Sequence, residues 1–156
     1  MLERSFDYIC SMANSQAVSH QPSSRDRHEI LIVEDNFINQ KVAASMLEEF
    51  GLPVVIADNG QAALELLNEN PNVCFILMDL QMPIMDGVSC ARAIRAGQAG
   101  EDYQSIPIVA LTANVADEHR QACEEVGMND FIGKPVKLDQ FRSVVSEYLK
   151  PFMSMP

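Results

Sequence analysis

The sequence lacks the features that mark membrane and secreted proteins. No apolar stretch approaches the roughly 20 residues that a membrane-spanning helix needs, and the N-terminus has no apolar signal-peptide core. Tryptophan is absent, and the four cysteines are scattered without CxxC spacing: Cys10, Cys74, Cys90 and Cys123. This pattern argues against a zinc site and is typical of thiols in a reducing compartment. We therefore expect a cytoplasmic protein.

Basic residues are also scarce. The chain has 11 Lys and Arg against 22 Asp and Glu, a net charge of −11. Basic and acidic residues balance over 1–28, so the whole acidic excess lies in 29–156. Such a surface argues against binding to nucleic acid or to an anionic membrane. It favours a cation or a basic partner surface.

The composition predicts one domain with flanking segments. A chain of 156 residues has room for one ordinary domain. We expect an N-terminal tail over 1–28, a domain over 29–150 and a C-terminal tail over 151–156. Apolar residues over 2–13 fall on one helical stripe, and 14–28 has the composition of a linker. The stripe is a frayed tail, the remnant of an upstream domain, or a partner-binding helix.

Strand and helix patterns alternate along the central region. Apolar runs followed by turn residues predict strands, which lie at 29–33, 53–57, 73–79, 107–112 and 130–133. Between and after them, helical patterns are expected over 36–50, 60–70, 88–96, 115–126 and 139–149, and 97–105 is a glycine-rich polar loop. This alternation predicts an α/β fold, a doubly wound (βα)5 parallel sheet of order 2-1-3-4-5, which is flavodoxin-like.

Side-chain spacing predicts how two of the helices face the core. In the first helix the i+4 series Ile38, Val42, Met46 and Phe50 is expected to be buried, which leaves Phe37 exposed. In the last helix we expect three inward residues and a helix end at Pro151; the inward residues are Phe141, Val145 and Tyr148. Asn36 and Asp86 are predicted N-caps, and Gly51 a helix terminator.

Polar residues follow the ends of the central strands. They are Glu34, Asp35, Asp79, Thr112 and Lys134. In the predicted strand order these ends meet at the ligand-binding edge of the sheet. Clustered carboxylates require a cation, and hard oxygen ligands favour Mg²⁺. A carboxylate can also attack phosphorus, while a lysine and a hydroxyl hold the transferred group.

Four motifs together resemble the receiver domain of two-component response regulators. They are ILIVEDN (30–36), MDLQMPIMDG (78–87), ALTAN (110–114) and FIGKP (131–135), and the resemblance covers about 29–150. The first two are most similar to receivers of hybrid sensor histidine kinases. The resemblance implies a phosphoacceptor, a Mg²⁺ site and phosphate-binding groups. The implied roles are phosphoacceptor for Asp79, Mg²⁺ binding for Asp35, Asp79, the Gln81 backbone carbonyl and, through water, Glu34, and phosphoryl binding for Thr112 and Lys134.

The resemblance also implies a conformational switch. Phe131 matches the aromatic residue that moves inward when Thr112 is drawn to the phosphate, and Lys134-Pro135 is expected to be a cis peptide. The surface made by 115–126, 130–133 and 139–149 would respond, and it would mediate any phosphorylation-dependent dimer. Gln81 and Asn114 occupy positions that affect the lifetime of the phosphate.

The implied partner is a histidine kinase or a histidine phosphotransfer protein. We expect the exposed Phe37, together with Gln40 and Ala44, to form an apolar surface that contacts this partner beside the phosphorylation site. The domain itself would be a phosphoacceptor that catalyses the transfer of the phosphoryl group from the donor to its own aspartate, rather than an enzyme with turnover. Both flanks are too short for a DNA-binding domain, so we expect a stand-alone receiver or part of a hybrid kinase.

Particular residues argue against three other functions. A haloacid-dehalogenase-type phosphatase needs a second Asp two residues after the nucleophile, where this chain has Gln81. A flavodoxin-like electron carrier needs a phosphate-binding loop rich in Ser, Thr and Gly after the first strand, but Glu34-Asp35 would repel phosphate there. A degenerate receiver that only binds proteins is the remaining alternative, and the intact set of acidic residues argues against it.

Overall fold

The computed structural model describes residues 27–113 and 116–153. The predicted helix over 2–13, nearly all of the predicted linker and Asn114 lie outside the described residues. Within these ranges no helix is long and apolar enough to cross a membrane.

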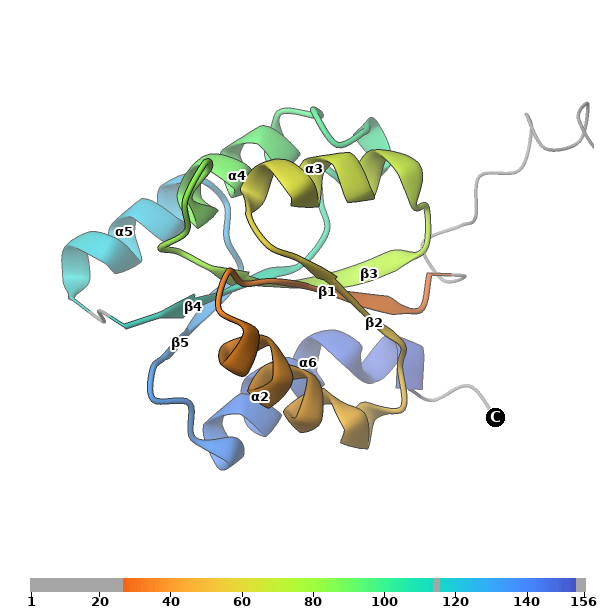
Figure 1. The fold of residues 1–156 in the computed structure, drawn as a ribbon, viewed down its shortest axis with the longest axis vertical. Helices are drawn as coiled ribbons and strands as arrows, with labels where there is room; N and C mark the ends of the chain where they lie inside the picture. The colour runs from red at the N-terminus through yellow and green to blue at the C-terminus, as the bar shows by residue number, and fades with distance from the viewer. Residues whose placement is uncertain (1–26, 114–115, 154–156) are drawn as a thin grey trace, which may run out of the picture.

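A five-stranded parallel sheet of order β2-β1-β3-β4-β5 forms the centre of the molecule (Figure 1). Every residue of β3 and β4 is buried. Continuous apolar strands are typical of parallel sheets that helices cover on both faces. The predicted doubly wound fold and strand order are therefore confirmed. The strands are β1 (Glu29–Val33), β2 (Val54–Ala57), β3 (Val73–Asp79), β4 (Ile108–Thr112) and β5 (Asp130–Gly133).

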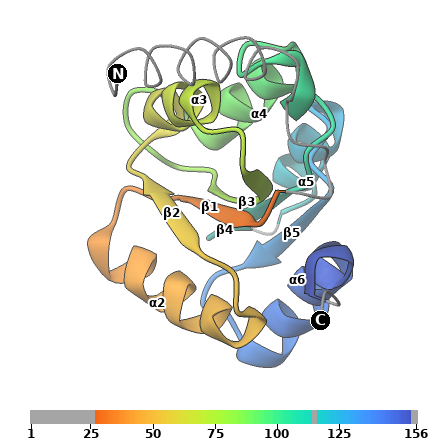
Figure 2. The same cartoon turned by 90° about the vertical axis from the view of Figure 1, so that its right-hand side faces the viewer.

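Helices cover both faces of the sheet, with α2 and α6 on one face and α3, α4 and α5 on the other (Figures 1 and 2). Each face has its own hydrophobic core. The helices are α2 (Phe37–Leu47), α3 (Gly60–Glu69), α4 (Gly87–Arg95), α5 (Asp117–Glu125) and α6 (Leu138–Met153), with 3-10 turns η1 (Glu48–Phe50) and η2 (Glu101–Tyr103). The η2 turn lies within the segment that was predicted to be an irregular loop.

Local side-chain hydrogen bonds set the helix starts beside the strand ends. The Asn36 side chain accepts a bond from the Asn39 N–H, and the Asp86 side chain accepts one from the Ser89 N–H. Both are N-caps, as predicted, and they satisfy backbone donors that have no partner inside the helix. Gly51 adopts a left-handed conformation with φ of 69° and ends the segment that follows α2, also as predicted.

The predicted inward face of α2 was wrong in its first half. Ile38 and Val42 are exposed, whereas Phe50 is buried as predicted and the half-buried Met46 packs against the core. The buried residues of α2 itself are Gln40, Ala43 and Leu47. An i+4 series drifts by roughly 40° around a helix at each step, so residues 38 and 50 lie about 120° apart and cannot share one face. The alternating steps of three and four residues from Gln40 to Phe50 stay aligned with the sheet, and that face is the buried one.

The end of α6 also differs from the prediction. Phe141, Val145 and Leu149 are its buried residues, while Tyr148 is half-buried and tilts against Phe75 with ring centroids 5.9 Å apart. Pro151 lies inside the helix, which continues to Met153. A proline near a helix end removes only one backbone donor. The half-buried Phe152 packs against the core on this face, which holds the last turn in place.

Arg27, at the end of the predicted linker, is buried in the domain. Its guanidinium lies 4.6 Å from the centroid of the Tyr103 ring, and Nη1 donates to the Asp102 carbonyl at 3.0 Å. The Tyr103 hydroxyl in turn accepts a hydrogen bond from the Val73 N–H at 3.2 Å. These contacts attach the chain before β1 to the edge of the sheet opposite the strand ends that carry the acidic residues.

Candidate functional site

The register of the sheet brings the polar strand ends together. Val33 of β1 pairs with Met78 of β3, so Glu34 and Asp79 follow at the same level. Thr112, the last residue of β4, pairs with Gly133 of β5, which places Lys134 directly beyond it. Three neighbouring strands and the adjacent β5 therefore end in one group of charged and polar residues. The predicted convergence of these residues is confirmed.

Three carboxylates form the acidic part of the site. Oxygens of Glu34, Asp35 and Asp79 all lie within 4.8 Å of one another. Glu34 and Asp79 are buried, with 1% and 5% of their surface exposed, whereas Asp35 is exposed. The Gln81 N–H donates weakly to Asp79 Oδ1 at 3.4 Å. Buried like charges repel one another strongly unless a cation lies close to them.

Lys134 supplies one positive charge to this cluster. Its Nζ lies 3.1 Å from Glu34 Oε2 and 3.4 Å from Asp79 Oδ1. Burial by itself lowers the pKa of Lys134, but the hydrogen bonds and negative charges of Glu34 and Asp79 outweigh burial and raise the pKa above its usual value. The ammonium is therefore charged at neutral pH. One cation opposes three carboxylates, so the cluster keeps a negative excess that suits a divalent metal ion.

The two predicted switch residues lie on neighbouring strands. Thr112 is buried with 5% of its surface exposed. Phe131 of β5 is half-buried, and the Arg120 guanidinium of α5 lies 4.4 Å from its ring centroid. Phe131 thus has surface left to bury, as an inward movement requires. The expected cis peptide between Lys134 and Pro135 is present.

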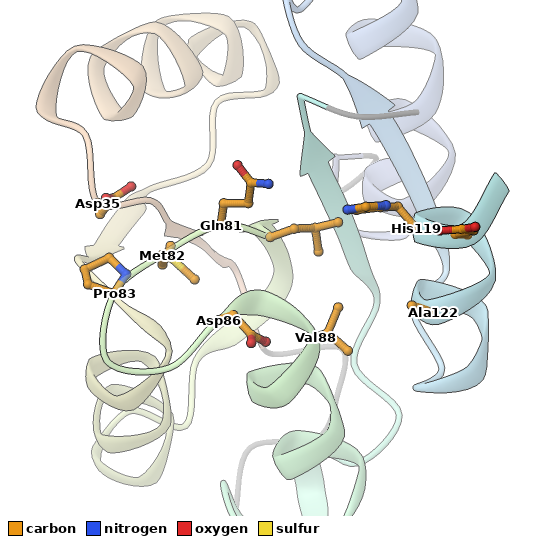
Figure 3. A pocket seen from close by; sticks show the side chains of 10 residues that line it. Asp35, Gln81, Met82, Pro83, Asp86, Val88, His119 and Ala122 are labelled. Atoms are coloured by element: carbon orange, nitrogen blue, oxygen red, sulfur yellow. The ribbon is translucent and has the colours of Figure 1, made fainter. Parts of the chain in front are cut away.

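A cavity of about 660 Å³ opens beside the acidic cluster, between the loop after β3 and helix α5 (Figure 3). Asp35 and Pro83 lie on one side of it, and His119 points into it from α5 on the other. Gln81 also lines it. His119 was not identified from the sequence, because a lone histidine in a polar helix carries no motif. Its position after β4, at the same edge of the sheet, is the only sequence signal for it.

The three predicted docking residues are placed very differently. Phe37 is 66% exposed, as expected, and Lys41 Nζ lies 4.9 Å from its ring centroid. Gln40 is buried, and its Nε2 donates to the Glu34 carbonyl at 2.7 Å and to Asp58 Oδ1 at 2.9 Å. Its side chain is therefore committed to the interior, and the prediction that it contacts a partner was wrong. Ala44 is half-buried and packs against the core.

The thiols of the described residues lie outside this site. Cys74, Cys90 and Cys123 are free and buried. Burial raises the pKa of Cys74 and of Cys90 to about 12. Both thiols are protonated at neutral pH and are poor nucleophiles and poor metal ligands. Such thiols act as small packing residues of the interior.

Known proteins have sequences similar to this chain. The family model of the response regulator receiver domain matches residues 30–146. The hybrid signal transduction protein dokA of Dictyostelium discoideum is 41% identical over 127 residues, which span 81% of this chain and 7% of that protein. The hybrid signal transduction histidine kinase K of the same organism is 39% identical over 148 residues, 92% of this chain and 12% of that protein. The chain thus spans a small part of these relatives.

Solved structures of receiver domains are similar to this chain in fold and sequence. The receiver domain of sensor histidine kinase PA1611 from Pseudomonas aeruginosa, with magnesium coordinated in its active site cleft, is 36% identical with a TM-score of 0.70, covering 80% of this chain and 98% of that chain. The receiver domain of Saccharomyces cerevisiae Ssk1 was crystallised with the histidine phosphotransfer protein Ypd1. It is 30% identical with a TM-score of 0.70, and the match covers 83% of this chain and 95% of that chain. Fold, motifs and site agree with these matches, and the chain belongs to the response regulator receiver domain family of two-component phosphorelay signalling.

Proposed function

We propose that Asp79 accepts a phosphoryl group from a phosphohistidine. The observation that carries the proposal is a buried carboxylate at the end of the central strand, 3.4 Å from the Lys134 ammonium and within 4.8 Å of two further carboxylates. An Asp79 oxygen attacks phosphorus, a P–O bond forms, and the P–N bond to the donor imidazole breaks. Lys134 offsets the negative charge of the phosphoryl group, and the Thr112 hydroxyl binds one of its oxygens.

The carboxylate cluster fits Mg²⁺. Its donors are all hard oxygens. The three carboxylates carry more negative charge than the single Lys134 ammonium can neutralise, which leaves room for a divalent cation. We propose that Asp35, Asp79 and the Gln81 backbone carbonyl hold the ion and that Glu34 contributes through water. When bound, Mg²⁺ neutralises charge on the transferred group. The magnesium in the related PA1611 receiver supports this assignment.

The relatives support a proposal for the biological setting. We propose that the donor is a histidine kinase or a histidine phosphotransfer protein, and that the chain acts alone or as part of a hybrid kinase. The domain would then be an acceptor and conformational switch rather than an enzyme with turnover, and phosphorylation would act on the surface of α5, β5 and α6, including any dimer formed there. Buried, reduced thiols support a cytoplasmic location.

The acceptor assignment is tested by substituting the carboxylate. With acetyl phosphate and Mg²⁺, we expect the wild-type chain to gain one phosphate and Asp79→Asn to gain none, because an amide is a far weaker nucleophile than a carboxylate. Intact-mass spectrometry measures both, and Asp58→Asn, at a neighbouring carboxylate outside the cluster, is the control. Undiminished labelling of Asp79→Asn would show that another residue is the acceptor.

The exposed apolar face of α2 is the proposed donor contact. Ile38 and Val42 are 70% and 45% exposed, and Phe37 adds a third apolar side chain two residues after Asp35. We propose that these three residues, instead of Phe37 with Gln40 and Ala44, meet the donor. Val42 also lines a cavity of about 280 Å³ with Pro135, so this apolar surface continues toward the strand end that carries Lys134.

Phe37→Ala tests this contact. We expect transfer from a phosphohistidine protein to slow by about tenfold, since burying an aromatic side chain at an interface contributes more than about 1 kcal/mol. Phosphorylation by acetyl phosphate should be unchanged, because that donor is too small to use the contact. Quenched-flow or gel-shift kinetics with both donors measure the difference. Equal slowing with both would place the defect in the site or the fold.

A further inference from the structure

A buried glutamine lies on the inward face of α2. Gln40 is 7% exposed, and the other buried residues of this helix are Ala43 and Leu47. An amide on a face that packs against the sheet costs free energy unless its polar atoms form hydrogen bonds. A leucine or a methionine would fill similar space without that cost. The amide of Gln40 therefore indicates a polar role at this position.

The Gln40 amide binds the first residue after β1. Its Nε2 donates to the Glu34 carbonyl at 2.7 Å and to Asp58 Oδ1 at 2.9 Å. Two acceptors on one nitrogen use both hydrogens of the amide group and fix its orientation. Strand β2 ends at Ala57, whose carbonyl accepts the Glu34 N–H at 3.1 Å. Strand β2 thus holds Glu34 by its N–H, and a side chain of α2 holds it by its carbonyl.

This carbonyl belongs to the peptide bond that leads into Asp35. A peptide unit is planar, so a fixed carbonyl also fixes the direction in which the next residue continues. The Glu34 side chain has restraints of its own, because Oε1 accepts the Asn36 N–H at 3.1 Å and Oε2 lies 3.1 Å from Lys134 Nζ. Asp35 is exposed and lines the cavity beside the cluster (Figure 3). The direction of its carboxylate is therefore set by the backbone that carries it.

We propose that Gln40 is a positioning residue for the metal site, because its amide holds the peptide unit from which Asp35 projects. The inference rests on the proposed function, in which Asp35 helps to hold Mg²⁺. Mg²⁺ demands near-octahedral geometry, so a carboxylate that turns away from the ion loses affinity for it. Hydrogen bonds behind a ligand typically contribute about 10- to 100-fold to metal affinity. Asp79 pairs with Leu111 in the sheet, so its own placement does not depend on this amide.

Gln40→Met tests the role of the amide. Methionine is flexible and of similar length but has no amide group, so the packing of α2 is kept and the bond to the Glu34 carbonyl is lost. We expect the Mg²⁺ dissociation constant of the full chain, measured by calorimetric or NMR titration with Mg²⁺ alone, to rise at least about tenfold. Labelling by acetyl phosphate should slow at low Mg²⁺ and return to the wild-type rate at saturating Mg²⁺.

Two further variants separate positioning from stability. Gln40→Asn keeps an amide but is one methylene shorter, so it should lose the bond to the Glu34 carbonyl and weaken Mg²⁺ binding in the same way. Leu47→Val is the matched control on the same buried face of α2. It removes a methylene group from the core, so it should lower the melting temperature and leave the Mg²⁺ dissociation constant unchanged. Failure of both Gln40 variants to fold would assign the residue to stability and overturn the positioning role.

The remaining outcomes distinguish the inference from the proposed function. An unchanged Mg²⁺ dissociation constant in the Gln40 variants would overturn the positioning role and leave the proposed function standing. Labelling that stays slow at saturating Mg²⁺ would show that Gln40 acts on Asp79 or the fold, which also overturns the inference. A wild-type chain that is phosphorylated but binds no Mg²⁺ would overturn the metal assignment and the role of Gln40 together. A wild-type chain that acetyl phosphate does not label would overturn the proposed function, even where the Gln40 variants weaken Mg²⁺ binding.

Discussion

Asp35 differs from the other two carboxylates of the cluster in its exposure. Glu34 is almost fully buried and its Oε1 accepts a hydrogen bond from the Asn36 N–H at 3.1 Å, while its Oε2 faces Lys134. Asp79 also faces Lys134. Asp35 is exposed, and within the described part of the chain Lys134 pairs with Glu34 and Asp79 but not with Asp35. Its charge adds repulsion with little compensation until a cation arrives.

We therefore expect Asp35→Ala to fold normally and to lose Mg²⁺ binding. Relief of repulsion should raise the melting temperature by up to about 4 °C, which corresponds to about 1 kcal/mol. Phosphorylation by acetyl phosphate should become insensitive to Mg²⁺ and slow by at least about tenfold. Thermal melts with and without Mg²⁺ measure stability and metal binding, and intact-mass spectrometry over time measures the phosphorylation rate. Wild-type phosphorylation that persists at full rate in excess chelator would contradict the metal assignment.

At the scale of elements, the loop from β3 to α4 depends on close backbone contact. The Gly87 N–H donates to the Leu80 carbonyl at 3.0 Å. A Cβ at Gly87 would lie 2.3 Å from the Asp79 carbonyl oxygen and 2.9 Å from the Leu80 Cα. These are backbone atoms, which cannot move without shifting the end of β3. The start of α4 is thus packed directly behind Asp79, the proposed acceptor residue.

Gly87→Ala should accordingly destabilise the domain by more than about 2 kcal/mol and reduce phosphorylation of Asp79. Gly51→Ala is the matched control. Gly51 has a φ of 69° but nothing within 4 Å of its Cβ position, so only conformational strain of about 1 kcal/mol is expected and phosphorylation should be unaffected. Urea unfolding and acetyl phosphate labelling compare the two. Similar losses for both variants would mean that the contact with Asp79 is unimportant.

At the scale of the whole molecule, the two faces of the sheet have different tasks. The α2 face carries the proposed donor contact, and the opposite face carries α5, whose Arg120 covers Phe131. Thr112 connects them, because it ends β4 beside both Asp79 and β5. A phosphoryl group that binds Thr112 more tightly in one conformation than in another would shift the population of Phe131 positions. We therefore expect the proposed switch to depend on the packing of the whole molecule.

Beryllofluoride, a phosphoryl analogue, should reveal this coupling. We expect NMR chemical-shift changes at Thr112 and Phe131 and along α5, β5 and α6, because Phe131 becomes more buried and releases Arg120. Thr112→Val, which lacks the hydroxyl but keeps the shape, should confine the changes to the Asp79 site. Changes confined to that site in the wild-type chain would argue against the switch.

The sequence by itself determined the strands, their order and the polar residues at their ends. Apolar runs such as 73–78 are buried in any parallel sheet, and the caps Asn36 and Asp86 act through bonds to residues three positions away. Packing decided the rest. Whether Ile38 or Gln40 of α2 faces the sheet depends on helix rotation against distant residues, and the close contact between the loop after β3 and α3 depends on Gly60, whose N–H donates to the Met85 carbonyl. Local patterns encode local hydrogen bonds and burial, whereas rotation, cavities and strain arise only where elements meet.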